Sequence, residues 1–188
     1  MPEFDRNTMQ LGDLPLFIAG DVNADLSLLH EAADEGYIAG VNAVSDSLTC
    51  FKRRTPLAIV FSEPGIAAVG LRFNQLAASC LVGCVDFSKQ GRALTAQINQ
   101  GVMRIYADCD NYRILGAEMC APAAEHLAHL LALAIYRELT VHDMLAMSFY
   151  HPVLEEGLRT ALRDISVQSA VSQADLSHCS AFGSAALD

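Results

Sequence analysis

The apolar positions nearest the N-terminus follow first a strand-like and then a helix-like pattern. Residues 16–19 form a short apolar run that stops at Gly20-Asp21, which predicts a buried strand ending in a turn. Small and apolar residues then recur at helical spacing, with Asp25 or Ser27 as candidate N-caps. The residues expected on the buried face of this helix are Leu29, Ala32, Ala33, Gly36 and Ala39. A single strand and helix cannot bury both faces of a sheet, so this segment is expected to be the end of an α/β domain.

The pattern changes after a polar and basic stretch at residues 47–55, which we interpret as a linker. Residues 56–64 place β-branched and aromatic residues between two prolines and predict a strand. Residues 66–79 are expected to lead into a short helix, and residues 80–88 to form a further strand. Residues 101–121 contain two strand-like runs joined by an Asp-Asn turn, which predicts a hairpin.

Helical patterns dominate after the hairpin. Residues 121–139 are so apolar that the predicted helix is expected to be buried on most of its circumference. A second, short helix is predicted at residues 143–147, and the small, polar residues 166–188 are expected to form a flexible tail. The order of elements predicts an α+β domain at residues 56–165, with an antiparallel sheet backed by helices.

The composition argues against several classes of function. A net charge of −10 disfavours nucleic-acid binding, because phosphate contacts require clustered lysines and arginines. The longest apolar run, residues 127–136, contains His129 and is shorter than the roughly 20 residues that span a bilayer. The N-terminal residues lack the pattern of a secretory signal, and six cysteines in such a chain are typical of reduced thiols. We therefore expect a cytoplasmic protein with no nucleic-acid or membrane partner.

A histidine next to a proline is the strongest candidate for chemistry. Proline fits the first position of a helix, so His151 is expected at or just before the N-cap, with Pro152 opening the helix. Glu156 would then lie about one turn further on, where its carboxylate can reach back to a ring nitrogen. A carboxylate on one nitrogen sets the tautomer and raises the basicity of the other, so the pair is a candidate general acid/base. The alternative is a surface histidine followed by acids that only stabilise the helix dipole.

An acidic residue also follows the first predicted strand. In open α/β sheets, an acid at the carboxyl end of a strand binds sugar hydroxyls of nucleotides, which makes Asp21 a candidate. The N-terminus of the next helix, near Leu28, Leu29 and His30, would point at an electron-rich ligand atom nearby. An ordinary turn aspartate remains the alternative.

Histidines and cysteines elsewhere predict no metal ligands and no disulfide. His126 and His129 lie at i and i+3 beside Glu125, but no third histidine follows at a recognised metal-site spacing. Polar positions on a buried helix are the preferred interpretation. Cys80 and Cys84 lie too far apart for a disulfide within an extended strand, so we interpret them as structural thiols.

Several motifs resemble, in this order, parts of one protein family. They are "FIAGDV" with "LLHEAADEGYIAG", "VFSEPGIAAVGL", "DFSKQGRAL", "YRILGAEMCAPAAEHLAHLLALAIYRELTVHDM" and "FYHPVLEEGL". Together they span about residues 14–163 and resemble the C-terminal part of the flavin-dependent pyridine nucleotide–disulfide oxidoreductases, in particular the dihydrolipoamide dehydrogenases. Their co-occurrence at these separations is more specific than any single motif.

The resemblance implies roles for the candidate residues. In this family the histidine of the HP motif enters the partner subunit's active site as the acid/base for the redox thiols, which implies that role for His151, with Glu156 orienting it. The aspartate of the GD motif binds the ribityl chain of FAD, which implies that role for Asp21. The helix that follows points its N-terminus at the flavin ring, which implies flavin contacts for residues 28–30.

The resemblance also implies a domain organisation. Residues 56–165 resemble the dimerisation domain and imply a homodimer, and residues 1–46 resemble the C-terminal remnant of an FAD-binding domain. The sequence contains no GxGxxG fingerprint and no CxxxxC redox pair, so it is expected to be a fragment that binds no cofactor and has no turnover alone. The full-length enzyme would use FAD, NAD and a dithiol/disulfide substrate. The identity of that substrate and the choice between NAD and NADP lie outside these residues.

Val153 stands where the family's HPT motif has threonine, which removes one hydroxyl at the helix start and leaves the proposed His-Glu pair intact. Mercuric reductases also resemble this chain, but they carry a vicinal cysteine pair near the C-terminus, where this chain has only Cys179. The same region of a mercuric or glutathione reductase-like enzyme is kept as one alternative. The other is a homodimerising assembly module without catalytic or ligand-binding activity of its own.

Overall fold

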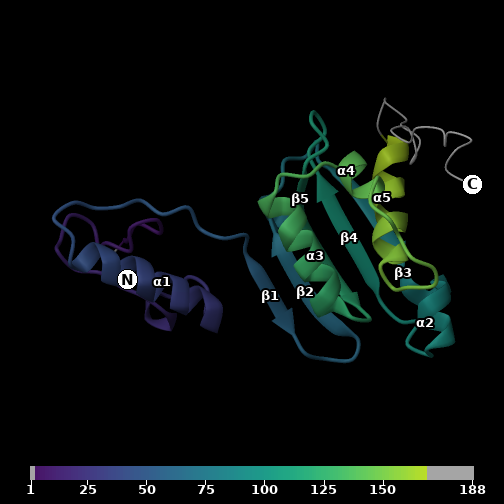
Figure 1. Ribbon diagram of the computed structural model, residues 1–188, viewed down its shortest axis with the longest axis horizontal. Helices are drawn as coiled ribbons and strands as arrows, with labels where there is room; N and C mark the ends of the chain where they lie inside the picture. The colour runs from purple at the N-terminus through teal and green to yellow at the C-terminus, as the bar shows by residue number, and fades with distance from the viewer. Residues whose placement is uncertain (1–2, 169–188) are drawn as a thin grey trace, which may run out of the picture. The chain divides into compact units, whose positions relative to one another are not determined.

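The computed structural model describes residues 3–168 and divides the chain into two compact units. The first unit is Met1–Arg54 and the second is Thr55–Asp188. Figure 1 shows one long helix in the first unit and a sheet with several helices in the second.

The first unit consists of one long helix and irregular chain. A short 3₁₀ turn, η1 (Asp21–Asn23), precedes the helix α1 (Leu29–Ala43). The strand predicted at residues 16–19 is not formed, since Phe17 makes only an isolated bridge to Gln10. A strand is stabilised by hydrogen bonds to neighbouring strands, and the described residues of this unit contain no sheet that could supply them.

Helix α1 buries a different face from the predicted one, and its N-cap also differs. Leu29, expected on the buried face, is 88% exposed. The helix begins after Leu28, which makes no side-chain cap hydrogen bond, and the predicted N-cap Asp25 instead pairs with Arg6 (Oδ2 to Nε, 2.7 Å). Ser27 is not the N-cap either. The predicted face is exposed to solvent because the described residues of this unit contain no sheet that could cover it. The residues that α1 buries are Glu31, Glu35, Ile38 and Asn42.

The segment predicted as a linker, residues 47–55, contains no helix or strand. Part of it is held against the first unit: Thr49 N–H donates to the Asn42 side chain at 2.7 Å, and Phe51 N–H donates to the carbonyl of Asn7 at 2.9 Å. The division between the two units falls after Arg54.

The second unit is built on a five-stranded antiparallel sheet with the strand order β1-β2-β5-β4-β3. Strands β4 and β5 form the predicted hairpin, with Arg104 opposite Glu118. The segment predicted to lead into a helix contains β2 instead, because Ala67 and Val69 alternate onto the core face of the sheet. The strands are β1 (Leu57–Val60), β2 (Gly65–Gly70), β3 (Leu81–Asp86), β4 (Val102–Ala107) and β5 (Ile114–Ala121).

Helices pack against the core face of this sheet (Figure 1). Helix α3 (Ala124–Tyr136) packs on β2 and β5, and α5 (Glu156–Gln168) packs on β3 and β4. Helix α4 (Val141–Leu145) contacts α5, and the short α2 (Gly91–Thr95) follows the 3₁₀ turn η3 (Phe87–Lys89). The predicted α+β fold, an antiparallel sheet backed by helices, is confirmed. Fully buried core side chains include Met103, Ile105, Leu127, Leu131, Leu158 and Leu162.

Two of the predicted helices differ in detail. Helix α3 buries only one face, since Leu133 and Tyr136 are more than half exposed. Helix α5 includes residues 166–168, which were expected in the tail, and residues 169–188 lie outside the described residues. None of the helices in the described part is long and apolar enough to cross a membrane.

Candidate functional site

The loop between α4 and α5 carries His151, and α5 begins at Glu156. The helix therefore starts later than predicted: Pro152 is not its first residue, and residues 151–155 form a bend and a turn. Because side chains tilt toward the N-terminus of their helix, Glu156 reaches back toward the loop. Its Oε1 and Oε2 atoms lie 3.0 Å and 3.2 Å from Nδ1 of His151.

Neighbouring contacts hold Glu156 in this position. Its Oε2 atom accepts a hydrogen bond from the Val153 N–H at 3.2 Å, and the Val153 carbonyl accepts one from the Gln90 side chain at 2.6 Å. Gly157, the next residue of α5, lies against the buried ring of Phe87, where a Cβ atom would collide with that ring. The start of α5 is thus fixed by the segment that follows β3.

The pKa of Glu156 lies below its ordinary value. The hydrogen bond from His151 is the largest cause; the Val153 N–H and the charges of His151 and Arg159 act in the same direction, while burial opposes them. We assign the proton to Nδ1 of His151 because an ionised carboxylate can only accept. The His151 side chain is 79% exposed, and within the described residues its Nε2 atom makes no hydrogen bond. This arrangement can accept a proton at Nε2 from a group outside those residues.

The predicted cofactor-binding residues lie in the first unit. Asp21 begins η1 and is exposed, and no hydrogen bond to its carboxylate occurs among the described residues. Leu28, Leu29 and His30 form the N-terminus of α1, and no side chain caps it. An exposed acid and an uncapped helix N-terminus fit a ligand that has hydroxyl donors and an electron-rich ring.

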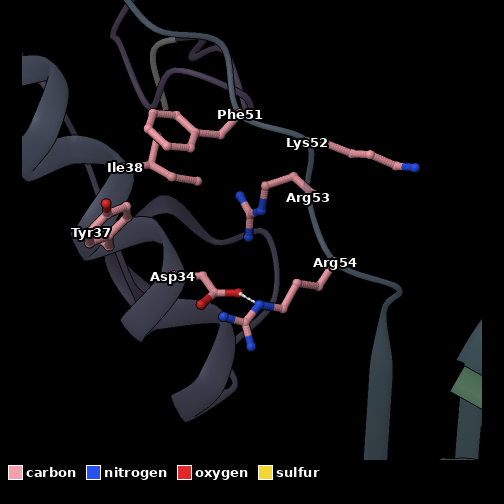
Figure 2. Close-up of a pocket in the computed structure, with 7 residues that line it drawn as sticks. All are labelled: Asp34, Tyr37, Ile38, Phe51, Lys52, Arg53 and Arg54. Carbon is pink, nitrogen blue, oxygen red and sulfur yellow. Dashed lines mark ion pairs between the residues drawn. The ribbon is translucent and has the colours of Figure 1, made fainter. Parts of the chain in front are cut away.

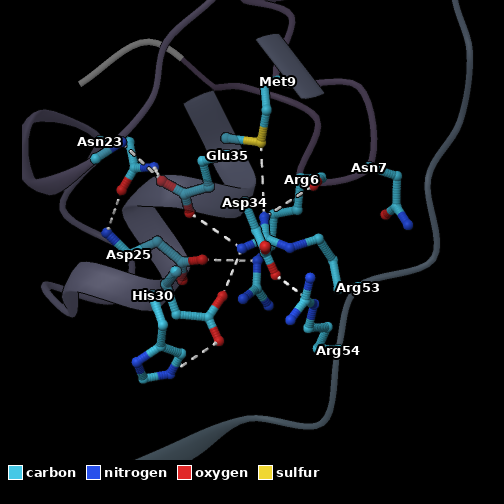
Figure 3. A network of polar contacts seen from close by, with 12 residues as sticks. Arg6, Asn7, Met9, Asn23, Asp25, His30, Asp34, Glu35, Arg53 and Arg54 are labelled. Carbon is cyan, nitrogen blue, oxygen red and sulfur yellow. Dashed lines mark hydrogen bonds and ion pairs between the residues drawn. The ribbon is translucent and has the colours of Figure 1, made fainter. Parts of the chain in front are cut away.

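A network of polar contacts centred on Arg53 was not predicted from the sequence (Figure 3). Arg53 Nη2 lies 2.6 Å from Oε2 of Glu31 and 3.3 Å from Oε1 of Glu35. The second Glu35 oxygen accepts hydrogen bonds from the Gly20 N–H and from the Asn23 side chain, both at 2.7 Å. The spacing of residues in the sequence could have indicated this network, because Glu31 and Glu35 lie on the same face of α1 as the buried Ile38 and Asn42. A buried acid requires a partner.

A pocket of about 190 Å³ opens beside this network (Figure 2). The rings of Tyr37 and Phe51 contact each other edge to face in it, with centroids 6.0 Å apart. Arg54 pairs with Asp34 at 2.9 Å across the pocket, and Lys52 extends away from the other labelled side chains. Asp34, Arg53 and Arg54 are paired within this unit, and we assign the pocket no ligand.

The histidines considered for metal binding lie on the solvent-facing side of α3. His126 is exposed and lies 3.6 Å from Oε1 of Glu125, and Nδ1 of His129 contacts the Glu125 carbonyl at 2.6 Å. The expectation that this helix is buried on most of its circumference was wrong, because α3 is amphipathic and both histidines lie on its exposed side. Acidic and thiol groups also gather at Asp108, Cys109 and Asp110, on the tip of the β4–β5 hairpin.

The fold matches that of solved flavoprotein structures. The protein titled LpdA from Mycobacterium tuberculosis superimposes with a TM-score of 0.71 and 26% identity, over 85% of this chain and 35% of that one. The HOCl-induced flavoprotein disulfide reductase RclA from Escherichia coli gives a TM-score of 0.70 at 19% identity, over 86% of this chain and 38% of that one, which shows a shared fold. The five-stranded antiparallel sheet with its helices is the fold of the dimerisation domain of flavoprotein disulfide reductases.

Residues 57–162 match the family described as pyridine nucleotide-disulphide oxidoreductase, dimerisation domain, and the chain belongs to that family. Dihydrolipoyl dehydrogenase 2 of Haloarcula marismortui is 32% identical over 149 residues, which is 78% of this chain and 31% of that protein. The NAD(P)H dehydrogenase (quinone) of Mycobacterium tuberculosis is 26% identical over 151 residues, which is 79% of this chain and 31% of that protein. The chain thus spans about a third of the length of these relatives.

Proposed function

We propose that this chain is the C-terminal dimerisation region of an FAD-dependent, NAD-linked disulfide oxidoreductase of the dihydrolipoamide dehydrogenase type. Residues 56–165 form the homodimer interface, and His151 of each subunit acts in the active site of its partner. The family of residues 57–162 and the dihydrolipoyl dehydrogenases among the relatives support this proposal.

The contact between His151 Nδ1 and the Glu156 carboxylate is the observation that carries the proposal. While the Nδ1–H of His151 remains hydrogen-bonded to the Glu156 carboxylate, Nε2 takes a proton from a substrate dithiol and leaves a thiolate. The Glu156 carboxylate stabilises the imidazolium that forms, as the acid partner of a histidine does in other proton-transfer sites. In the reverse step Nε2 returns the proton to the thiolate.

The first unit contributes groups that fit a flavin. Asp21 offers an exposed carboxylate that can accept hydrogen bonds from ribityl hydroxyls, and the N-terminus of α1 at residues 28–30, which no side chain caps, favours negative charge nearby. When bound, FAD would supply the group that accepts electrons from the thiols, and NAD would supply the next electron acceptor. The 188-residue chain by itself is expected to bind neither cofactor tightly and to have no turnover.

The first test is the oligomeric state of the 188-residue chain. Sedimentation velocity should show a dimer at micromolar concentration, because specific interfaces bury enough surface for stable association. A strict monomer at high concentration would contradict the proposed interface.

The second test uses a chimera in which residues 14–163 replace the matching segment of the Haloarcula dihydrolipoyl dehydrogenase. Oxidation of dihydrolipoamide by NAD should be retained in the chimera, and Asp21→Asn should weaken its retention of FAD. The assembly-only alternative predicts instead that the chimera dimerises but that substitutions at His151 leave its turnover unchanged.

A further inference from the structure

Glu35 is fully buried in the middle of α1, yet it does not belong to the His151 site or to the proposed flavin contacts. Its Oε2 atom accepts hydrogen bonds from the Gly20 N–H and from the Asn23 side-chain amide, both at 2.7 Å. Gly20 directly precedes η1 and Asn23 ends it, so one oxygen atom binds both ends of the turn that begins at Asp21. Figure 3 shows the contact with Asn23.

The other oxygen of Glu35 faces Arg53. The guanidinium lies 3.3 Å from Glu35 and 2.6 Å from Glu31, and it donates to the Arg6 carbonyl at 3.1 Å. Burial acts to lower the pKa of Arg53, but the hydrogen bonds and charges of the two glutamates outweigh it and raise that pKa. Arg53 is therefore charged, and it supplies the positive charge that a carboxylate without solvent contact requires.

Among the residues that the structure describes, no side chain other than Glu35 bonds both ends of this turn. Gly20 has a positive φ of 78°, and its N–H lies outside any strand, so the Glu35 carboxylate is the acceptor that satisfies it. Asn23 is 5% exposed, and its amide would be left unpaired in the interior without the same oxygen. Because Glu35 is part of α1, it also links the turn to the helix whose N-terminus lies at residues 28–30.

We infer that Glu35 is a positioning residue that fixes the position of the Asp21 turn relative to the N-terminus of α1, with Arg53 as its charge partner. The functional meaning of this relation rests on the proposed flavin contacts of Asp21 and residues 28–30. Both contacts would be aligned by one side chain that touches neither the ligand nor the solvent.

Amide hydrogen exchange of the 188-residue chain, measured by NMR, tests the inference without any cofactor. Glu35→Met introduces an apolar side chain of similar length and removes both acceptor oxygens. The Gly20 N–H should then exchange at least about tenfold faster than in the wild type, with the amides of residues 38–43 in the same helix as the internal reference. Glu35→Gln keeps one acceptor oxygen and should restore most of the protection of Gly20. Glu31→Met is the matched control: it removes the other carboxylate on Arg53 and should leave Gly20 exchange within about threefold of the wild type.

Three outcomes would overturn the inference. One is Glu35→Met with unchanged Gly20 exchange. Another is Glu31→Met with the same effect as Glu35→Met. The third is equal loss of protection at Gly20 and throughout α1, which would assign Glu35 a general role in stability. The flavin proposal fails separately, if Asp21→Asn leaves FAD retention unchanged in the chimera.

Discussion

Oε1 of Glu156 lies 3.0 Å from Nδ1 of His151 because α5 begins at Glu156 rather than at Pro152. The first residue of a helix points its side chain back toward the preceding loop, and here that loop carries the histidine. Gln90 and Val153 fix the loop, so the acid contacts one ring nitrogen while the other is exposed. An ordinary helix cap would use Glu156 only for backbone N–H groups.

Replacing His151 tests the proposed proton transfer directly. In the chimera, His151→Gln should lower kcat for dihydrolipoamide oxidation by about 10²–10⁴, the range for loss of a general acid/base. The flavin absorption spectrum should be unchanged, because the substitution leaves the first unit intact. The exposed His126→Gln serves as the control and should retain wild-type turnover. Equal activity of the two variants would reject the assignment.

The lowered pKa of Glu156 makes a pH-dependent contribution to stability. A carboxyl group whose pKa is lower in the folded than in the unfolded chain stabilises the fold fully above its unfolded pKa, near 4.5, and loses this contribution as the pH falls through the folded value. The difference in unfolding free energy between the wild type and Glu156→Gln should therefore be about 1 kcal/mol or less near neutral pH, as for a largely exposed pair.

Urea unfolding between pH 2 and pH 7 measures this difference. It should be constant above about pH 4.5 and shrink at lower pH. A difference in unfolding free energy that grows toward low pH would show that folding does not lower the pKa of Glu156.

Gly83 allows α5 to approach the sheet closely. A Cβ atom at this position would collide with the Ala161 carbonyl oxygen and with the Ile165 side chain, so Gly83→Ala should reduce the unfolding free energy by about 1–3 kcal/mol. Gly91→Ala is the control, since no atom outside its immediate neighbours lies within 4 Å of the added Cβ. Denaturant unfolding of both variants checks this, and equal stabilities would contradict the tight contact.

Tyr106 should retain its proton in alkaline solution. Burial and then the hydrogen bond to Glu118, at 2.7 Å, raise the pKa of Tyr106 well above its ordinary value. Its contribution to stability is full below the unfolded pKa of about 10 and is lost as the pH rises toward the folded value. The wild type should be about 1–3 kcal/mol more stable than Tyr106→Phe at neutral pH, and this advantage should shrink above about pH 10.

The control is Tyr150→Phe, which should leave the unfolding free energy at neutral pH close to the wild-type value because this side chain is exposed. Chemical unfolding at several alkaline pH values compares the two variants. An advantage of Tyr106 that persists unchanged at the highest pH would contradict the prediction.

Local pattern was sufficient for much of the second unit. Alternating strands around an Asp-Asn turn predicted the β4–β5 hairpin, and the apolar run at residues 121–139 predicted α3, because both signals depend on neighbours within a short stretch of chain. The HP motif likewise drew attention to His151 and Glu156, since proline and a nearby acid carry their constraints in the sequence itself.

Tertiary structure decided the features that depend on distant partners. Whether residues 16–19 pair as a strand depends on a sheet that these residues cannot form alone, and which face of α1 is buried depends on Arg53 and the N-terminal loop. The position of Glu35 beneath the Asp21 turn was equally hidden, because a buried carboxylate is stable only where separate segments bring it donors and a positive charge. Sequence periodicity reports which residues share a face, whereas the groups that meet that face are known only once the chain has folded.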